Sequence, residues 1–380
     1  MSNYSKQKSN KPRNGIVICG SYGLGNAGDE SILKAILQEA RTVAPDQKIT
    51  VLSRNPEETV VRHGVHAIHM FNIPAVRKAM RHAKLYINGG GSLIQDVTSR
   101  RSLWYYLYTL RTAKRLGCKV MMYGCGIGPV NHPKDVVLTR RTLNRYVDAI
   151  TLREDSSLQE LEHFGVTEPI IVLSSDPALR LQRADEAAID HLMEENGLEP
   201  RGAYLGLCLR NWPGFEEKIP VFVDTIQYAA DHYGLTPVFF SINHHSDSTA
   251  ADRVKRALGQ DVCVIRHPLS TELTLGLISR MQAVISMRLH GLIFAAGQGV
   301  PLVGIVYDPK VSSFLSYMGQ DLYEDLSVIT RDSLRANLDQ ALALRSDLSA
   351  LEKAVAHLRS IEQHNSDMMK KLLDDAGAAK

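Results

Sequence analysis

Residues 15–40, GIVICGSYGLGNAGDESILKAILQEA, predict a strand, a turn and a helix in succession. The apolar run Ile16–Gly20 is typical of a strand, and three glycines separate it from a segment with helical spacing. That segment has apolar residues three and four positions apart, which places them on one helical face: Ile32, Leu33, Ile36, Leu37 and Ala40. A strand, a glycine turn and a helix in this order form the repeating unit of α/β proteins.

The same alternation continues along most of the chain. Further strands are predicted at residues 49–53, 85–88, 119–123, 149–152 and 170–173, and a second series at 204–210, 237–241, 262–266, 283–286 and 302–306. Helical patterns between them indicate parallel sheets that are covered by helices on both sides. We therefore predict an α/β protein with two Rossmann-like domains and an inter-domain cleft.

The alternation pauses once, near residue 180, and this pause marks a domain boundary. We expect a disordered leader over residues 1–14, an N-terminal Rossmann-like domain over 15–180 and a C-terminal Rossmann-like domain over 181–330. Residues 331–380 have helical spacing and are predicted to form a C-terminal helical segment that packs back on the domains.

The composition, with 44% hydrophobic and 22% charged residues among 380, is typical of a soluble globular protein. Apolar stretches are interrupted within a dozen residues, so no transmembrane helix is expected. The polar, basic N-terminus lacks the apolar region of a signal peptide. The five cysteines form no C-x-x-C pair, which favours reduced thiols in the cytosol over disulfides or zinc.

Charge is distributed unevenly along the chain. Residues 1–180 hold 25 Lys and Arg against 15 Asp and Glu, whereas residues 181–380 hold 19 against 26; the resulting +10 and −7 sum to +3. Between Arg77 and Lys119, ten basic residues accompany a single acid, Asp96. Such a patch favours phosphates, nucleic acid or an anionic membrane, and a solvated basic face is the alternative.

GLGNAG, residues 23–28, matches the G-x-G-x-x-G pattern of dinucleotide-binding proteins. Those proteins also need an acid at the end of the second strand, but KITVLS ends in Ser53 and Arg54. The carboxylates Asp29 and Glu30, which follow the motif, would oppose a pyrophosphate. We interpret Gly20–Asp29 as one wall of the cleft, where Asn26 contacts another anionic or sugar group. Asp29 or Glu30 is the candidate base, and a helix cap is the alternative role of Asp29.

Two further glycine clusters follow predicted strands: NGGGSLIQD (residues 88–96) and YGCGIGP (residues 123–129). Glycines let backbone N–H groups approach a ligand closely, and α/β proteins bind ligands at the carboxyl ends of their strands. We expect substrate contacts from Gly89, Gly90, Gly91 and Ser92. A sharp turn is the alternative reading of this cluster.

Basic side chains also follow predicted strands. Arg153 and Arg210 are placed to grip a carboxylate or phosphate, although a salt bridge to Glu154 or Asp155 is the alternative for Arg153.

The segment SMRLHGL (residues 286–292) ends another strand with Arg288 and His290, and Lys310 follows the next strand. Two cations beside an imidazole form an anion site with a proton donor. The remaining histidines have no partnering cluster, so no metal site is expected.

These segments together resemble the polysaccharide pyruvyl transferase family, with the closest likeness to the bacterial CsaB type. The resemblance runs from about Gly15 to about Leu322 and rests on separated motifs in the same order. They are G-x-x-G-x-G-N-x-G-D, NGGG-S-L, L-R-E-D-S-S, L-R-N-W and S-M-R-L-H-G-L.

The resemblance implies a glycosyltransferase-B-like fold and transfer of pyruvate, as a ketal, from phosphoenolpyruvate to two sugar hydroxyls. For the CsaB type, the sugar is N-acetylmannosamine of a lipid-linked precursor, ketalised at positions 4 and 6, in secondary cell-wall polymers that anchor S-layers. The N-terminal domain would hold the acceptor and the C-terminal domain the phosphoenolpyruvate. Arg288 and His290 would bind and protonate this donor.

The candidate residues suit that chemistry. Arg210, Arg288 and Lys310 would bind the carboxylate and phosphate of the donor, His290 would protonate its C3, and Asp29 would deprotonate the sugar. The reaction requires no metal or redox cofactor.

A lipid-linked acceptor also gives the basic segment RRSLWYYLYTLRTAKRLG, residues 100–117, a specific interpretation. Arginines and lysines mixed with Trp104, Tyr105, Tyr106 and Tyr108 favour a membrane interface. We expect peripheral contact of residues 100–119 with the anionic inner face of the plasma membrane, on the cytoplasmic side, and no nucleic-acid partner. A core helix whose aromatic residues face inward is the alternative.

Three other functions remain as alternatives. A nucleotide-sugar-dependent glycosyltransferase or epimerase would need an acid on the donor ribose, and no glutamate lies between His290 and Lys310. A non-catalytic membrane-docking assembly protein would have no reason to keep Arg288, His290 and Lys310. An oxidoreductase would bind NADH.

Overall fold

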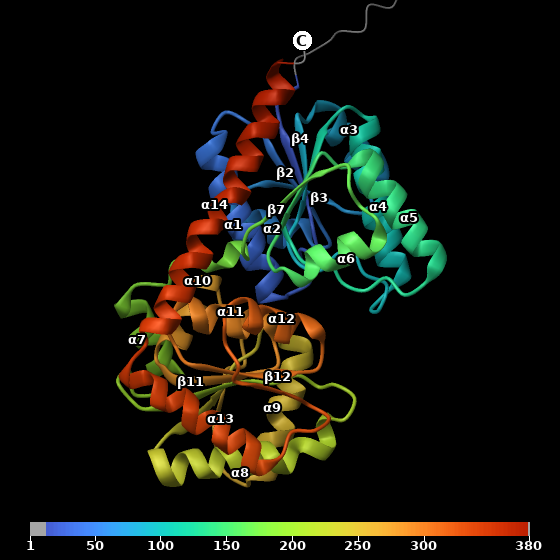
Figure 1. Ribbon diagram of the computed structural model, residues 1–380. Coiled ribbons are helices and arrows are strands. Elements are labelled where there is room, and N and C mark those ends of the chain that lie inside the picture. The colour runs from blue at the N-terminus through green and yellow to red at the C-terminus, as the bar shows by residue number, and fades with distance from the viewer. Residues whose placement is uncertain (1–12, 379–380) are drawn as a thin grey trace, which may run out of the picture.

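The computed structural model describes residues 13–378 and consists of two α/β domains, one above the other in Figure 1. The first domain is built on a seven-stranded sheet of order β3-β2-β1-β4-β5-β6-β7 in which all pairings are parallel. Its strands are β1 (Ile16–Cys19), β2 (Ile49–Ser53), β3 (His66–His69), β4 (Leu85–Gly89), β5 (Lys119–Cys125), β6 (Ala149–Leu152) and β7 (Ile170–Leu173).

Helices cover both faces of this first sheet. One face packs against α1 (Ala27–Val43) and the end of α14 (Ser349–Ala378). The other face packs against α3 (Ile73–His82), α4 (Arg100–Arg115), α5 (Pro133–Tyr146) and α6 (Ser156–Phe164). Helix α2 (Pro56–His63) lies beside β2 and β3. Because both faces are buried, the central strands are almost entirely apolar.

The second domain is built on a parallel six-stranded sheet of order β10-β9-β8-β11-β12-β13. Its strands are β8 (Tyr204–Cys208), β9 (Thr236–Phe239), β10 (Cys263–Val264), β11 (Met281–Ser286), β12 (Leu302–Val306) and β13 (Tyr323–Asp325). One face packs against α7 (Glu186–Glu195), α10 (Thr271–Ser279), α11 (Leu289–Gly297), α12 (Pro309–Tyr317) and the start of α14. The other packs against α8 (Phe215–Tyr233), α9 (His244–Leu258) and α13 (Arg331–Ala343).

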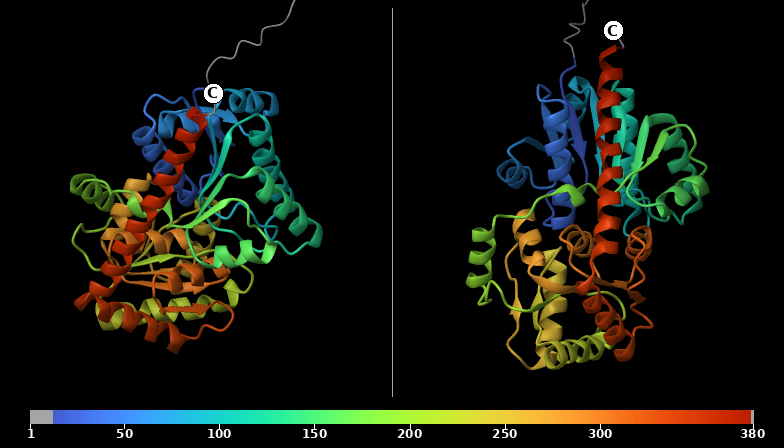
Figure 2. Two further views of the ribbon diagram at one scale, coloured as in Figure 1. Left: turned by 45° about the horizontal axis from the view of Figure 1, so that its top comes forward. Right: turned by 60° about the vertical axis from the view of Figure 1, so that its left-hand side comes forward.

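The chain crosses between the domains twice. The first crossing runs from β7 through the short 3-10 helix η1 (Pro177–Arg180) to α7. The second is made by α14, which follows α13 and the 3-10 turn η2 (Leu344–Ser346) and runs along both domains (Figures 1 and 2). The predicted C-terminal helical segment is therefore present, and it returns to the first domain.

The structure confirms the α/β fold class and places a strand at each predicted strand position, with two additions. The sequence did not indicate β3 or β13, because both lie at sheet edges and carry polar residues. The predicted leader, residues 1–14, lies mostly outside the described residues. Its last two residues belong to the folded domain: Arg13 donates to the carbonyl of Ala83 at 2.9 Å, and Asn14 donates to that of His82 at 2.9 Å.

Candidate active site

The glycine turn before α1 lies at the junction of the two domains. Gly23 and Gly25 have φ of +73° and +69°, a region that residues with a Cβ rarely adopt. Asn26 then caps α1, because its side-chain oxygen accepts from the Gly28 N–H at 3.0 Å. The next residue, Ala27, donates its N–H to the carbonyl of Ile242 in the second domain at 2.7 Å.

Gly28 packs against His290, which is the second residue of α11 in the other domain. A Cβ on Gly28 would lie 2.2 Å from Nδ1 of His290, so only glycine permits this approach. His290 itself is 9% exposed. The third glycine of GLGNAG therefore makes room for an imidazole from the second domain.

The other ring nitrogen of His290 faces a buried carboxylate. Nε2 of His290 lies 3.5 Å from Oδ2 of Asp176, which caps η1 and is 2% exposed. This Nε2 makes no hydrogen bond within residues 13–378. Burial alone would raise the pKa of Asp176, but His290, Arg153 and the Ala178 N–H hold it below its usual value. Asp176 is therefore held as an anion beside the imidazole of His290.

Arg153 is buried near the domain junction, and its guanidinium is hydrogen-bonded to other groups of the protein. Its Nε donates to Glu154 at 2.8 Å, its Nη1 to Asp176 at 3.1 Å and its Nη2 to Ser92 at 3.3 Å. The side chain is 3% exposed, and although burial opposes its charge, the two carboxylates raise its pKa. The predicted direct role of Arg153 in substrate binding does not fit this placement. The salt-bridge alternative does, and Arg153 holds Asp176 in position.

Asp29 lies on α1 beside this group. Asn26 donates to its Oδ2 at 2.8 Å. The pKa of Asp29 is raised to about 6, chiefly by burial; the charge of His290, and more weakly those of Arg153 and Lys310, oppose the rise, and the charge of Glu30 adds to it. Asp29 receives a hydrogen bond from the residue that caps α1 rather than capping the helix itself. It is half-buried and titrates close to neutral pH, as a general base requires.

The other candidate base, Glu30, has a structural role. Its Oε1 accepts from the Gly23 N–H at 2.8 Å, and its Oε2 lies 2.9 Å from Nε2 of His63 at the end of α2. These contacts fix the glycine turn and leave Asp29 as the candidate base, close enough to His290 for the charge of one to affect the pKa of the other.

The glycines after β4 pack mainly against the first domain. A Cβ on Gly89 or Gly90 would overlap Tyr22 or Ile32, and the Gly90 N–H donates to the carbonyl of Tyr123 at 3.0 Å. Predicted ligand contacts from these two residues therefore do not fit. Gly91 lies beside Asp29, since a Cβ added to this glycine would be 3.2 Å from Oδ1 of Asp29. The hydroxyl of Ser92 accepts a hydrogen bond from Arg153.

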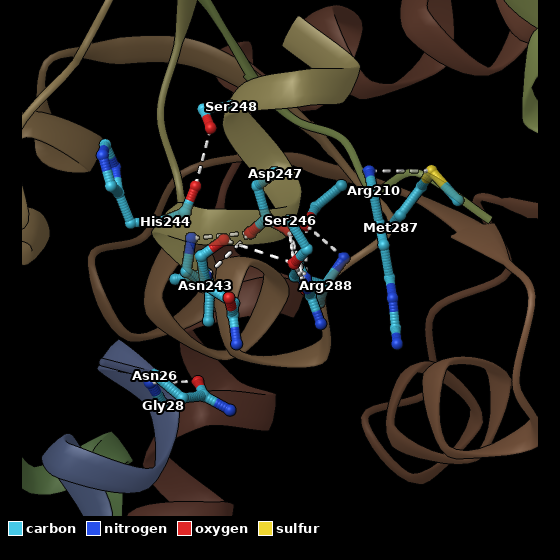
Figure 3. A network of polar contacts seen from close by, with 12 residues as sticks. Asn26, Gly28, Arg210, Asn243, His244, Ser246, Asp247, Ser248, Met287 and Arg288 are labelled. Carbon is cyan, nitrogen blue, oxygen red and sulfur yellow. Dashed lines mark hydrogen bonds and ion pairs between the residues drawn. The ribbon is translucent and has the colours of Figure 1, made fainter. Parts of the chain in front are cut away.

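Arg288 is held in place by Asp247 of α9 (Figure 3). Its Nε donates to Oδ1 of Asp247 at 2.9 Å, and its Nη2 donates to Ser246 at 2.5 Å. The other oxygen of Asp247 accepts from the N–H groups of Ile242 and Asn243 at 3.0 and 2.8 Å. Burial opposes the charge of Arg288, but Asp247 raises its pKa. The buried carboxylate of Asp247 thus holds both the guanidinium of Arg288 and residues 242–243, the segment whose Ile242 carbonyl accepts from Ala27.

Arg210 and Lys310 provide two further cations. Arg210 lies over the rings of Trp212 and Tyr307, at 4.5 and 4.9 Å from their centroids, and donates to the Tyr307 hydroxyl at 2.7 Å. Arg210 and Arg288 follow β8 and β11, which are neighbouring strands of the second sheet. Lys310 lies 2.8 Å from Asp308 and 5.6 Å from the centroid of the Tyr307 ring. These contacts fix the cations before any ligand binds.

The structure thus brings Asn26, Asp29 and Gly91 of the first domain together with His290, and it places Arg210, Arg288 and Lys310 on neighbouring strand ends of the second domain. Four residues that position this group were not predicted from the sequence: Asp176, Asp247, Trp212 and Tyr307. Asp176 and Tyr307 follow strands, so the rule applied to the arginines would have found them. Asp247 lies on a helix and gave no comparable signal.

Two surface hollows in the second domain lie apart from this group. One, of about 470 Å³, is lined by residues that include Tyr233, Asp339 and Arg345. Within residues 13–378, the side chains of His, Cys, Asp and Glu form no cluster suited to a metal ion.

Comparison with known proteins identifies relatives across most of the chain. Residues 26–309 match a family model described as polysaccharide pyruvyl transferase. The amylovoran biosynthesis protein AmsJ of Erwinia amylovora is 22% identical over 409 residues, which cover 92% of this chain and 95% of that protein.

Solved structures resemble the fold at low sequence identity. A glycosyltransferase from Rickettsia africae superposes with a TM-score of 0.63 and 12% identity, over 97% of this chain and 100% of that one. HepE of Anabaena, in complex with UDP-glucose, superposes with a TM-score of 0.62 and 10% identity, over 94% of this chain and 99% of that one. The UDP-GlcNAc 2-epimerase of Methanocaldococcus jannaschii superposes with a TM-score of 0.63 and 12% identity, over 87% of this chain and 92% of that one. These likenesses confirm the predicted glycosyltransferase-B-like fold.

Proposed function

The chain belongs to the polysaccharide pyruvyl transferase family, and we propose that it transfers pyruvate from phosphoenolpyruvate to two hydroxyls of a sugar as a cyclic ketal. Phosphate is the second product. The acceptor that we propose is N-acetylmannosamine of a lipid-linked cell-wall precursor, ketalised at positions 4 and 6. The AmsJ relative, an amylovoran biosynthesis protein, supports a role in polysaccharide assembly.

One observation carries this proposal: a histidine of the second domain meets a carboxylate of the first beside several fixed cations. His290 packs on Gly28, and its charge lowers the pKa of the neighbouring Asp29. A proton donor and a proton acceptor from opposite domains suit a reaction that adds an alcohol across a double bond.

The cations of the second domain suit the donor. Phosphoenolpyruvate carries a carboxylate and a phosphate on adjacent atoms, so its binding site needs several positive charges. Arg288 offers a guanidinium anchored by Asp247, and Arg210 offers one that lies over two aromatic rings. Lys310 adds a point charge that also acts on Asp29. Cations fixed in advance stabilise the negative charge that develops on a leaving phosphate.

The chemistry then proceeds in two additions. Asp29 accepts the proton of the first sugar hydroxyl as its oxygen bonds to C2 of the donor, and His290 delivers a proton to C3. The C2–O bond to phosphate breaks, phosphate departs, and an oxocarbenium ion remains at C2. The second hydroxyl adds to this carbon and gives its proton to the departing phosphate, which closes the ketal ring; proton exchange with solvent then restores Asp29 and His290. Asp176, whose carboxylate lies 3.5 Å from Nε2 of His290, places a negative charge beside the ring that donates this proton.

Phosphate release tests this function. Purified protein is mixed with phosphoenolpyruvate and a synthetic lipid-linked aminosugar disaccharide, and release should depend on both. His290→Ala should abolish release, whereas His191→Ala, which changes an exposed histidine of α7, should leave it intact. Consumption of a UDP-sugar without phosphate release from phosphoenolpyruvate would instead favour a nucleotide-sugar transferase.

A further inference from the structure

The outer surface of α4 and α5 carries many cations and almost no acid. The two helices hold nine Lys and Arg and one acid, Asp135. Asp135 is 3% exposed and accepts from Arg100 at 2.7 Å and from Trp104 at 2.9 Å. Its charge is therefore buried and neutralised, and the surface above it is basic.

Six of the other eight cations lie on one exposed face, together with four large exposed side chains that carry apolar surface. We call this the α4–α5 face, and its ten exposed members are Arg101, Trp104, Tyr108, Arg111, Arg115, Lys134, Val137, Leu138, Arg141 and Arg145. On each helix they recur at intervals of three and four, so they form two stripes that point away from the sheet. Helices α4 and α5 pack against each other on the outer side of the first domain, away from α14 (Figure 1).

Large apolar side chains lie exposed among these cations. Trp104, Tyr108, Val137 and Leu138 are 44%, 39%, 37% and 41% exposed. The Trp104 ring is fixed by its bond to Asp135 and lies 5.1 Å from the Arg100 guanidinium. Amphipathic aromatic and aliphatic side chains between cations are the composition of surfaces that bind the headgroup region of a bilayer.

We propose that the α4–α5 face docks on an anionic lipid bilayer. The charge of the face complements acidic phospholipid headgroups, and its apolar side chains reach the acyl boundary. Nucleic acid would engage the cations but would leave Val137 and Leu138 without a partner. No helix within residues 13–378 is long and apolar enough to cross a membrane, so contact through this face would be peripheral.

The position of the face agrees with a membrane-bound acceptor. Helices α4 and α5 begin after the loops that follow β4 and β5, at the same sheet edge as Ser92. Val97, in the first of these loops, is an apolar residue that is 62% exposed three positions before α4 begins. Docking here would bring the acceptor side of the junction to the bilayer. The proposal uses lipid chemistry alone, so it stands or fails independently of pyruvyl transfer.

Vesicle sedimentation tests the face. The variant Arg101→Glu, Arg111→Glu, Arg141→Glu should bind vesicles of phosphatidylglycerol and phosphatidylcholine about 100-fold more weakly than the wild type, since each surface cation contributes about a factor of five or more. The matched control is Arg256→Glu, Arg331→Glu, Lys353→Glu, which makes the same charge change at exposed positions of α9, α13 and α14. It should bind as the wild type does.

Trp104 reports the depth of contact. The chain has two tryptophans, so Trp212→Phe leaves Trp104 as the single emitter. Its emission should shift to shorter wavelength on anionic vesicles and remain unchanged on pure phosphatidylcholine. Equal binding by the two triple variants, an unchanged emission on anionic vesicles, or binding to duplex DNA without binding to vesicles would overturn the proposal.

Discussion

The contact between Gly28 and His290 joins the two domains at the scale of single residues. Glycine is less favourable than alanine inside a helix, but a side chain at position 28 would displace the imidazole of His290. The fingerprint that suggests a dinucleotide site thus has a different physical cause here. Two of its glycines allow the turn, and the third admits a histidine from the facing domain.

Gly28→Ala should lower kcat by about 100-fold, because a displacement of about 1 Å at a reacting group has that effect. Steady-state kinetics with phosphoenolpyruvate and the acceptor measure this loss, and thermal unfolding checks that the fold is intact. Gly297→Ala is the control at the other end of α11, where a Cβ would meet only ordinary contacts. Equal activity of both variants would show that the Gly28 contact does not position His290.

The pH dependence should report Asp29. Its pKa is raised to about 6, so the carboxylate that acts as base is present above this pH and is lost below it. We expect kcat/KM to fall as the pH drops through about 6. Phosphoenolpyruvate also titrates near this range, so the profile of Asp29→Asn gives the reference. If the wild type and Asp29→Asn show the same acid limb and similar rates, Asp29 is not the base.

Asp176 should act through His290. Asp176→Asn keeps a side-chain oxygen for Arg153 but removes the charge beside the imidazole, so kcat should fall about 10- to 100-fold while KM changes little. Glu154→Gln neutralises the other carboxylate on Arg153 without touching His290. A similar loss in both variants would mean that only the Arg153 network matters.

Helix α14 completes the hydrophobic core of both domains. Its first half buries Leu351, Val355 and Leu358 against the second domain, and its second half buries Met369 and Leu372 against the first. Between them, Ser175 donates to the carbonyl of Leu358 at 2.7 Å, and Asn365 donates to that of Ser175 at 3.2 Å. The relative placement of the domains therefore depends on this helix.

Leu358→Ala and Leu372→Ala should each reduce the free energy of unfolding by about 2–5 kcal/mol, the usual cost of removing a buried leucine. Because the helix links both cores, each variant should shift one cooperative denaturation transition of the whole chain. Lys353→Ala, an exposed position on the same helix, should leave the midpoint unchanged. Two separate transitions, of which only one moves, would contradict this coupling.

The sequence predicted most elements because the apolar periodicity of buried parallel strands and their helices is strong. It also predicted the strand-end residues Arg288, His290 and Lys310, since the ends of parallel strands meet along one edge. It failed where the outcome depends on packing between segments distant in the chain. Arg153 and Arg210 both follow an apolar strand, so their neighbours in the sequence do not distinguish them. In the structure, Arg153 is buried and paired with Glu154 and Asp176, whereas Arg210 lies over the ring of Trp212.

At the scale of the whole molecule, the proposed acid and base belong to different domains. Their meeting depends on the contact of Ala27 with Ile242, on the ion pair between Lys34 and Glu272, and on α14. Catalysis in this account is a property of the assembled pair of domains, and neither domain alone holds both groups.

The most direct test is the fate of the donor carbon. Phosphoenolpyruvate labelled with ¹³C at C2 is incubated with the lipid-linked acceptor in D₂O, and the product is analysed by NMR and mass spectrometry. If pyruvate is transferred as a ketal, the label becomes a ketal carbon bonded to two sugar oxygens, beside a methyl group that carries deuterium from the solvent. Label recovered only as free pyruvate or unchanged phosphoenolpyruvate, with the acceptor unmodified, would contradict it.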